Sequence, residues 1–172
     1  MSEDYAAKIT VSDIYLIVLW DTNYFEPRPQ DKRLCGRYIA EGLYSIEAFS
    51  TNNKPEHKFS KTIASKLLPS INKMIMDVES ELKKSLSEIK SKHSGSWISG
   101  IEIVEEKKRY VIGIPKGRLV STSGHLLRIM LIQNEITERL KNLALKGAIS
   151  TAEYKKIENI ASKPIRKLFY DL

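Results

Sequence analysis

The chain has 172 residues, with 28 Lys and Arg side chains against 21 Asp and Glu and a single cysteine. This length is enough for one domain with its own hydrophobic core, so stability requires neither metal ions nor disulfides. Because Cys35 is the single cysteine, the sequence can form neither an internal disulfide nor a cysteine-based metal site. Cys35 lies on an apolar stripe of a predicted helix, where a free thiol behaves as a small hydrophobic side chain. The longest apolar run, residues 14–20, is too short for a membrane span, so we expect a cytoplasmic protein without a membrane partner.

The formal net charge of +7 is concentrated in the second half of the chain. Residues 101–172 carry 14 basic and 8 acidic side chains, which is a net charge of +6. This surplus permits binding to nucleic acid or another anionic surface, although basic helix faces that are merely solvated give the same count.

The first half is predicted to contain one strand followed by helices. Alternation of apolar and polar residues that runs into β-branched ones predicts a strand at about 7–19. Apolar residues spaced by three and four predict a helix over 31–49, after a loop that contains two prolines. The same period continues over 58–92, where Pro69 should kink the helix or divide it in two near Leu68.

The second half is predicted to open with a β-hairpin, in which "WISGIEIV" and "RYVIGI" are joined by "EEKK". The return strand would turn Tyr110, Ile112 and Ile114 inward, and Arg109 and Val111 outward. A helix over 124–146 should follow, with N-cap candidates at residues 121–123 and Gly147 as its terminator.

The closing helix is predicted to start at Ser150 or Thr151, because Ser150 and Glu153 have the spacing of a capping box. Pro164 should bend this helix or restart it with Ser162 as the new cap.

These elements predict a single α+β domain over 1–172, mostly helical with short antiparallel strands. Residues 1–94, the strand plus helices, are expected to serve packing and dimerisation. Residues 95–172 would form a basic hairpin plus two helices.

Groups suited to catalysis do not converge in the sequence. The three histidines, His57, His93 and His125, show no metal-ligand spacing. P-loop, G-x-G-x-x-G and G-x-S-x-G motifs are absent from the sequence. We therefore expect a protein that is not an enzyme, with no cofactor, no metal site and no small-molecule substrate.

The order strand, helix, turn, helix in residues 108–170 permits a ribbon-helix-helix interpretation. A two-stranded antiparallel ribbon fits the major groove of DNA, and helix N-termini bind phosphate through free N–H groups. A single ribbon strand needs a partner from a second chain, so we expect a homodimer on double-stranded DNA, with extra helices around the ribbon.

The predicted DNA-binding residues depend on which strand forms the ribbon. If it is the hairpin strand, the groove is bordered by Lys107, Lys108, Arg109, Lys116 and Arg118. If it is the N-terminal strand, the bases are faced by Lys8, Thr10 and Ser12. The charge surplus favours the first placement, because phosphate contacts supply most of the affinity. In either case the helix start at Ser150 and Thr151 is a phosphate-binding candidate.

Two stretches, "KITVSDIYLIVLW" and "GHLLRIMLIQNEITERLKNLALKGAISTAEYKKIENIASKPIRKLF", carry a resemblance to a known family. The clearest part is the C-terminal pattern formed by Ala161, Ile165, Arg166, Lys167 and Phe169. The chain resembles the AcaB-like transcriptional activators of IncC conjugative plasmids and related proteins of integrative conjugative elements.

The resemblance implies a dimeric, ribbon-helix-helix-like activator that binds promoter DNA and raises the expression of conjugation genes. The predicted helices are longer than in the plainest form of that fold. Two other functions stay open: a non-enzymatic adaptor of the conjugation apparatus, and a relaxosome accessory protein that binds the transfer origin.

Overall fold

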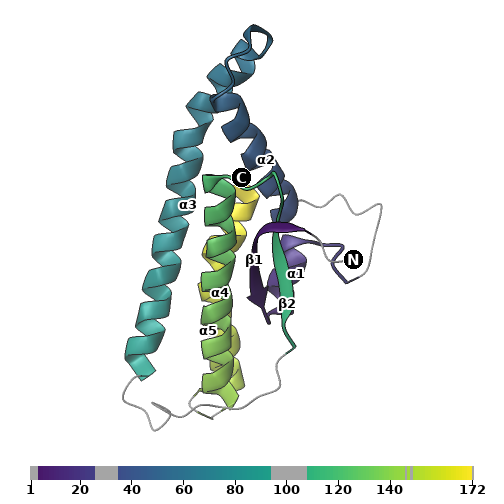
Figure 1. The fold of residues 1–172 in the computed structure, drawn as a ribbon. Coiled ribbons are helices and arrows are strands. Elements are labelled where there is room, and N and C mark those ends of the chain that lie inside the picture. Colours follow the sequence, from purple (N-terminus) through teal and green to yellow (C-terminus); the bar gives the residue numbers. More distant parts are fainter. Residues whose placement is uncertain (1–3, 26–34, 94–107, 146, 148, 172) are drawn as a thin grey trace.

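The fold consists of long helices around a small antiparallel sheet (Figure 1). A computed structural model describes residues 4–25, 35–93, 108–145, 147 and 149–171. In chain order the elements are β1 (Tyr5–Val11), α1 (Ile14–Trp20), α2 (Gly36–Ser50), the 3-10 helix η1 (Pro55–His57), α3 (Lys58–His93), β2 (Tyr110–Pro115), α4 (Ser121–Leu145) and α5 (Thr151–Asp171). The mostly helical α+β class with short antiparallel strands is confirmed.

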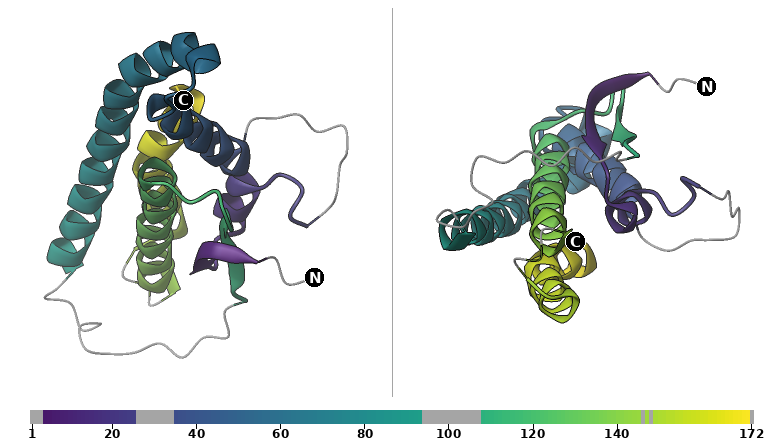
Figure 2. Two further views of the ribbon diagram at one scale, coloured as in Figure 1. Left: turned by 45° about the horizontal axis from the view of Figure 1, so that its top comes forward. Right: turned by 90° about the horizontal axis from the view of Figure 1, so that it is seen from below.

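Helix α4 lies at the centre and contacts α2, α3, α5 and both strands (Figures 1 and 2). Its side chains at Leu126, Ile129, Met130 and Ile136 are fully buried. A helix that is apolar on several sides is buried on several sides, which accounts for its central position. In the described ranges, no helix combines the length and hydrophobicity that a membrane span requires.

The two strands pair with each other although they lie far apart in the sequence. Ile9 is opposite Ile112 and Val11 is opposite Tyr110 in an antiparallel register. Residues 97–107, the first strand and turn of the predicted hairpin, lie outside the described residues. The described partner of β2 is therefore β1, and the two strands that the sequence offered as competing ribbons form one ribbon.

The N-terminal strand ends much earlier than predicted, and the apolar run after it is a helix. Asp13 caps α1, with its Oδ1 atom accepting a hydrogen bond from the Tyr15 backbone N–H at 3.0 Å. The buried residues of this helix are Leu16, Ile17 and Trp20. A continuous apolar run shows no period that separates strand from helix, so the predicted strand at 7–19 was wrong beyond Val11. The acidic N-cap was the available indication.

The prolines inside α3 and α5 do not divide these helices. Helix α3 is continuous through Pro69, and the helix changes direction towards its N-terminal end (Figure 2). Helix α5 is continuous through Pro164, so the predicted alternative of a restart at Ser162 was wrong. Ser162 donates its hydroxyl to the Asn159 carbonyl at 3.4 Å instead, and Arg166 donates to the same oxygen at 3.0 Å.

The predicted ends of α4 and α5 agree with the structure to within a few residues. The N-terminus of α4 is capped from two sides: Ser123 Oγ accepts from the Val120 N–H at 3.0 Å, and the Glu47 carboxylate of α2 accepts from the Thr122 N–H at 2.9 Å. Gly147 has a φ of +74°, as expected of the residue that ends a helix.

Candidate nucleic-acid interface

Side chains alternate between the two faces of the β1–β2 ribbon. On the inner face Val11, Ile112 and Ile114 are each 1% exposed. On the outer face of β1, Lys8 and Thr10 are exposed. Thr10 lies opposite Val111, and Lys8 lies opposite Gly113, which has no side chain. The exposed polar positions of the outer face, Lys8 and Thr10, therefore lie on β1, whereas on β2 Gly113 is buried and Val111 and Pro115 are half-buried.

Two further cations lie exposed at one end of the ribbon. Lys108 and Arg109 directly precede β2 and are exposed. By alternation, Arg109 lies on the same side of the ribbon as Val111, so it continues the outer row that includes Thr10. Within the described residues, Lys8, Lys108 and Arg109 make no ion pair with an acidic side chain. Lys107, predicted together with them, lies outside the described residues.

Lys116 and Arg118 lie at the opposite end of the ribbon and are partly engaged. Lys116 Nζ is 2.9 Å from Asp4 Oδ2, in a pair whose two side chains are 65% and 78% exposed. Pairs as exposed as this one stabilise little, so the ammonium group stays accessible. Arg118 follows a turn at Gly117, where φ is +78°, and its guanidinium lies 4.8 Å from the ring centroid of Tyr44 on α2. The predicted cations therefore divide between two ends of one ribbon.

Ser12 is turned into the protein and does not belong to the exposed row. Its hydroxyl donates to Glu138 Oε1 at 2.9 Å, and its backbone N–H donates to Asn134 Oδ1 at 3.1 Å. The Asp13 N–H donates to the same Asn134 oxygen at 3.3 Å. The prediction that Ser12 faces the bases is therefore corrected: with Asn134 and Glu138 it fixes the end of β1 to α4.

Two tyrosines near this junction stay protonated at neutral pH. Burial raises the pKa of Tyr154, and the carboxylates of Glu158 and Asp13 raise that pKa further. Burial also raises the pKa of Tyr15; the charge of Arg166 opposes this rise and Asp13 adds to it. Neutral phenols can donate hydrogen bonds, and Tyr154 forms one with Glu158 of the same helix.

Ser150 and Thr151 lie at the start of α5, and the ribbon and α5 lie on different sides of α4 (Figure 2). The predicted capping box is confirmed: the Glu153 N–H donates to Ser150 Oγ at 3.1 Å, and the Ser150 N–H donates to Glu153 Oε2 at 3.3 Å. The carboxylate of Glu153 offsets the positive end of the helix dipole. The structure thus gives Ser150 a capping role and does not bring these two residues to the ribbon cations.

A second basic surface was missed by the sequence reasoning. We call it the α5 basic face: the exposed side chains of Lys155, Lys156, Lys163, Arg166 and Lys167. Helical spacing places these positions on the side opposite the buried residues of α5, so the period of the charges could have revealed it.

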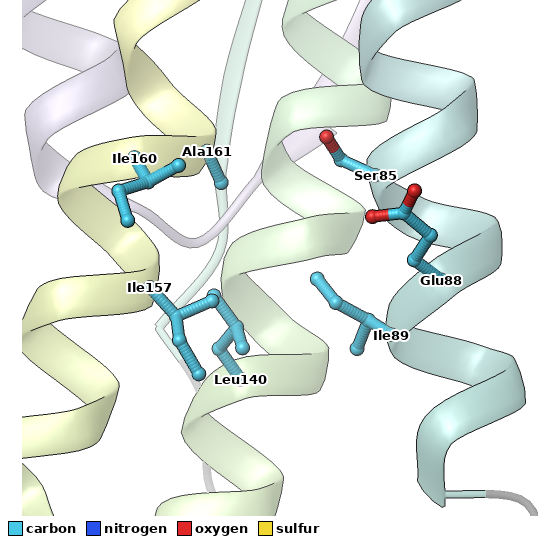
Figure 3. A pocket seen from close by; sticks show the side chains of 7 residues that line it. All are labelled: Ser85, Glu88, Ile89, Leu140, Ile157, Ile160 and Ala161. Atoms are coloured by element: carbon cyan, nitrogen blue, oxygen red, sulfur yellow. The ribbon is translucent and has the colours of Figure 1, made fainter.

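A cavity of about 190 Å³ lies among α3, α4 and α5 (Figure 3). Ser85 and Glu88 project beside it from α3, and its other walls are apolar: Ile89, Leu140, Ile157, Ile160 and Ala161. Ligand pockets commonly measure roughly 300–1,000 Å³, so this one is small. In the described part of the chain, no group of three His, Cys, Asp or Glu side chains could hold a metal ion.

Comparisons of the chain with protein-family models, curated proteins and solved structures found no match. The resemblance to AcaB-like activators stays a prediction that depends on the residues quoted for it.

Proposed function

We propose that the chain binds double-stranded DNA by placing the outer face of the β1–β2 ribbon in the major groove. One observation carries this proposal: the two strands pair within one chain and expose Lys8 and Thr10, while Lys108 and Arg109 lie exposed at one end of the ribbon. A two-stranded ribbon has the width that the major groove admits.

The roles of the side chains follow from their positions on the ribbon. Lys8 and Thr10, near the centre of the outer face, would meet base edges as hydrogen-bond partners. Lys108 and Arg109, at the end, would contact phosphates, which supply affinity without sequence information. The hydrogen bonds of Asn134 to Ser12 and Asp13 hold the ribbon in a fixed orientation on α4.

The finer proposal is a transcriptional regulator that activates plasmid conjugative-transfer genes as a homodimer. Its support is the resemblance to AcaB-like activators. Dimerisation would serve to place two ribbons on half-sites about one helical turn of DNA apart. It is not needed to complete a ribbon, because β1 and β2 of one chain already pair. A relaxosome accessory protein would share the DNA chemistry and differ in its target, so footprinting on promoter and transfer-origin fragments separates the two.

A different surface favours the alternative of a non-enzymatic adaptor. Phe59, Ile63 and Leu67 follow one another at four-residue spacing on α3 and are 78%, 42% and 46% exposed. A stripe of this kind is a typical contact for another protein. An adaptor would bind its partner through this stripe and would bind duplex DNA no better than other basic proteins do.

The test is the variant K8A/K108A/R109A, with duplex binding measured by fluorescence anisotropy at several salt concentrations. We expect weaker binding, and a slope of log K against log salt reduced by up to about 1.8, since the two lost phosphate contacts, at Lys108 and Arg109, contribute about 0.9 each. The matched control is K66A/K73A/K84A, which removes three exposed lysines of α3 and the same total charge. Equal affinity and slope for the ribbon variant and wild type would contradict the proposal.

A further inference from the structure

The α5 basic face extends along most of the helix. Lys156 and Lys167 are 11 residues apart, which at about 1.5 Å per residue corresponds to roughly 16 Å. Lys163 lies between them on the same side, and Lys155 and Arg166 flank this row. Duplex DNA carries one negative charge per about 1.7 Å of its axis, so a face of this length spans many phosphates.

The acidic residues of α5 do not neutralise this face. Glu153 is engaged in the capping box with Ser150. Glu158 is half-buried and forms a hydrogen bond with Tyr154. Asp171 lies at the C-terminal end of the helix. Within the described residues, none of the five cations makes an ion pair.

The helix carries these charges against its local preference. Lys163 has Arg166 three residues and Lys167 four residues further on, and like charges at these spacings destabilise a helix. The buried side chains of Ala161, Ile165, Leu168 and Phe169 hold α5 in place despite this repulsion. A face with several uncompensated like charges is suited to a polyanion.

We propose that the α5 basic face is a second phosphate-binding surface for double-stranded DNA, so that one chain holds two duplex segments. The ribbon and α5 lie on different sides of α4 (Figure 2), so a straight duplex lying in the ribbon would not also follow α5. The bridging of two segments rests on the proposed function of the ribbon; binding by the α5 basic face alone does not.

The chemistry of this face favours contacts that do not depend on sequence. Lysine ammonium groups act as point charges towards phosphate. The guanidinium of Arg166 is partly occupied by its hydrogen bond to the Asn159 carbonyl. Ile160, which lies between Lys156 and Lys163 in the sequence, lines the cavity among α3, α4 and α5 (Figure 3), and its apolar side chain offers no hydrogen bond to a base. We therefore expect the α5 basic face to bind duplexes of any sequence with a strong salt dependence.

The test is a bridging assay, in which a biotinylated duplex on beads captures a fluorescent duplex only when the protein holds both. For K156A/K163A/K167A we expect at least tenfold less capture, with binding of a single duplex by the ribbon retained. For K156R/K163R/K167R, which keeps the charge, we expect capture as in wild type. Alanine is a good helix former and these side chains are exposed, so α5 should fold in both variants, as circular dichroism would show.

The ribbon variant K8A/K108A/R109A separates the failures of the two proposals. If both hold, it loses capture and keeps the salt-dependent binding that depends on α5. If the ribbon does not bind DNA, K8A/K108A/R109A binds a duplex with the same affinity as wild type. The α5 alanine variant then loses duplex binding. Wild-type capture by the α5 alanine variant would overturn the inference; a dimer that bridges through two ribbons, or an acidic protein as the partner of α5, would give that result.

Discussion

At the scale of single residues, the ribbon depends on a position without a side chain. A methyl carbon added at Gly113 would overlap the Ala7 carbonyl oxygen and lie 2.8 Å from the Tyr5 ring. The backbone oxygen cannot move without disturbing the pairing of β1 and β2. The sequence showed a glycine in a strand, but the close approach appears only once the partner strand is known.

We predict that G113A lowers the free energy of unfolding by about 1–3 kcal/mol, the usual cost of overpacking. Urea unfolding followed by circular dichroism measures it. The control is G42A in α2, where an added methyl group meets open space. Because alanine is the better helix former, G42A should raise stability by about 0.5–1 kcal/mol. Equal stability of G113A and wild type would mean that β1 and β2 do not approach each other this closely.

At the scale of elements, α3 and α4 are joined by a cluster of charges around Glu79. Its carboxylate lies 2.9 Å from Arg128 Nε, 3.0 Å from Lys83 Nζ and 3.6 Å from His125 Nδ1. Burial alone would raise the pKa of Glu79, but the hydrogen bond from Lys83 and the charges of Lys83, Arg128 and His125 outweigh it and lower that pKa below its ordinary 4.5.

This lowered pKa makes part of the stability dependent on pH. In the unfolded chain Glu79 takes up a proton more readily than in the folded protein, so its contribution is present above about pH 4.5 and is lost as the pH falls through the folded pKa. We expect E79Q to be less stable than wild type at pH 7, with a smaller difference at pH 3. E81Q, at an exposed position of the same helix, is the control for urea unfolding at both pH values. A loss of stability in E79Q of the same size at pH 7 and at pH 3 would contradict this account.

The helices were the most predictable elements. Three- and four-residue apolar spacing over many turns indicated α3, α4 and α5 to within a few residues, and the Ser150–Glu153 pair marked the start of α5. Helix α1 was not predicted, because its seven apolar residues fit a buried strand equally well. Prolines were overrated as helix breaks: at Pro69 and Pro164 the buried contacts on both sides keep the helix continuous.

The candidate site was predicted only in part. The cations next to β2 were found from composition. Their relation to Lys8 and Thr10 depends on a strand pairing across most of the chain, which local patterns do not reveal. Ser12 looked exposed because its acceptor, Glu138, is on a distant helix. The α5 basic face was not predicted because its cations are spread along the sequence and gather on one side only through the helical period.

At the scale of the whole molecule, pairing of β1 with β2 within one chain distinguishes this fold from a ribbon shared by two chains. We predict that T10C/V111C, which places cysteines at opposed positions, forms a disulfide inside one chain on mild oxidation. Non-reducing electrophoresis and mass spectrometry would show a cross-linked monomer. Cys35 is 1% exposed and should not compete.

The control for this cross-link is A6C/V111C, in which the cysteines are four residues out of register and too far apart to join. A mixture of T10C and V111C single variants should give no disulfide-linked pair. A linked pair of chains from that mixture would show that the ribbon is shared between two molecules.

The distance in sequence between β1 and β2 has a consequence for biosynthesis. At about 5–20 residues per second, a ribosome needs roughly 5–20 s to make the hundred or so residues that separate Thr10 from Val111. For that time the first strand emerges without its hydrogen-bonding partner, and its backbone amides are open to any other nascent strand. Lys8 and Thr10 on its exposed side keep this waiting segment polar, which disfavours aggregation before the chain is finished.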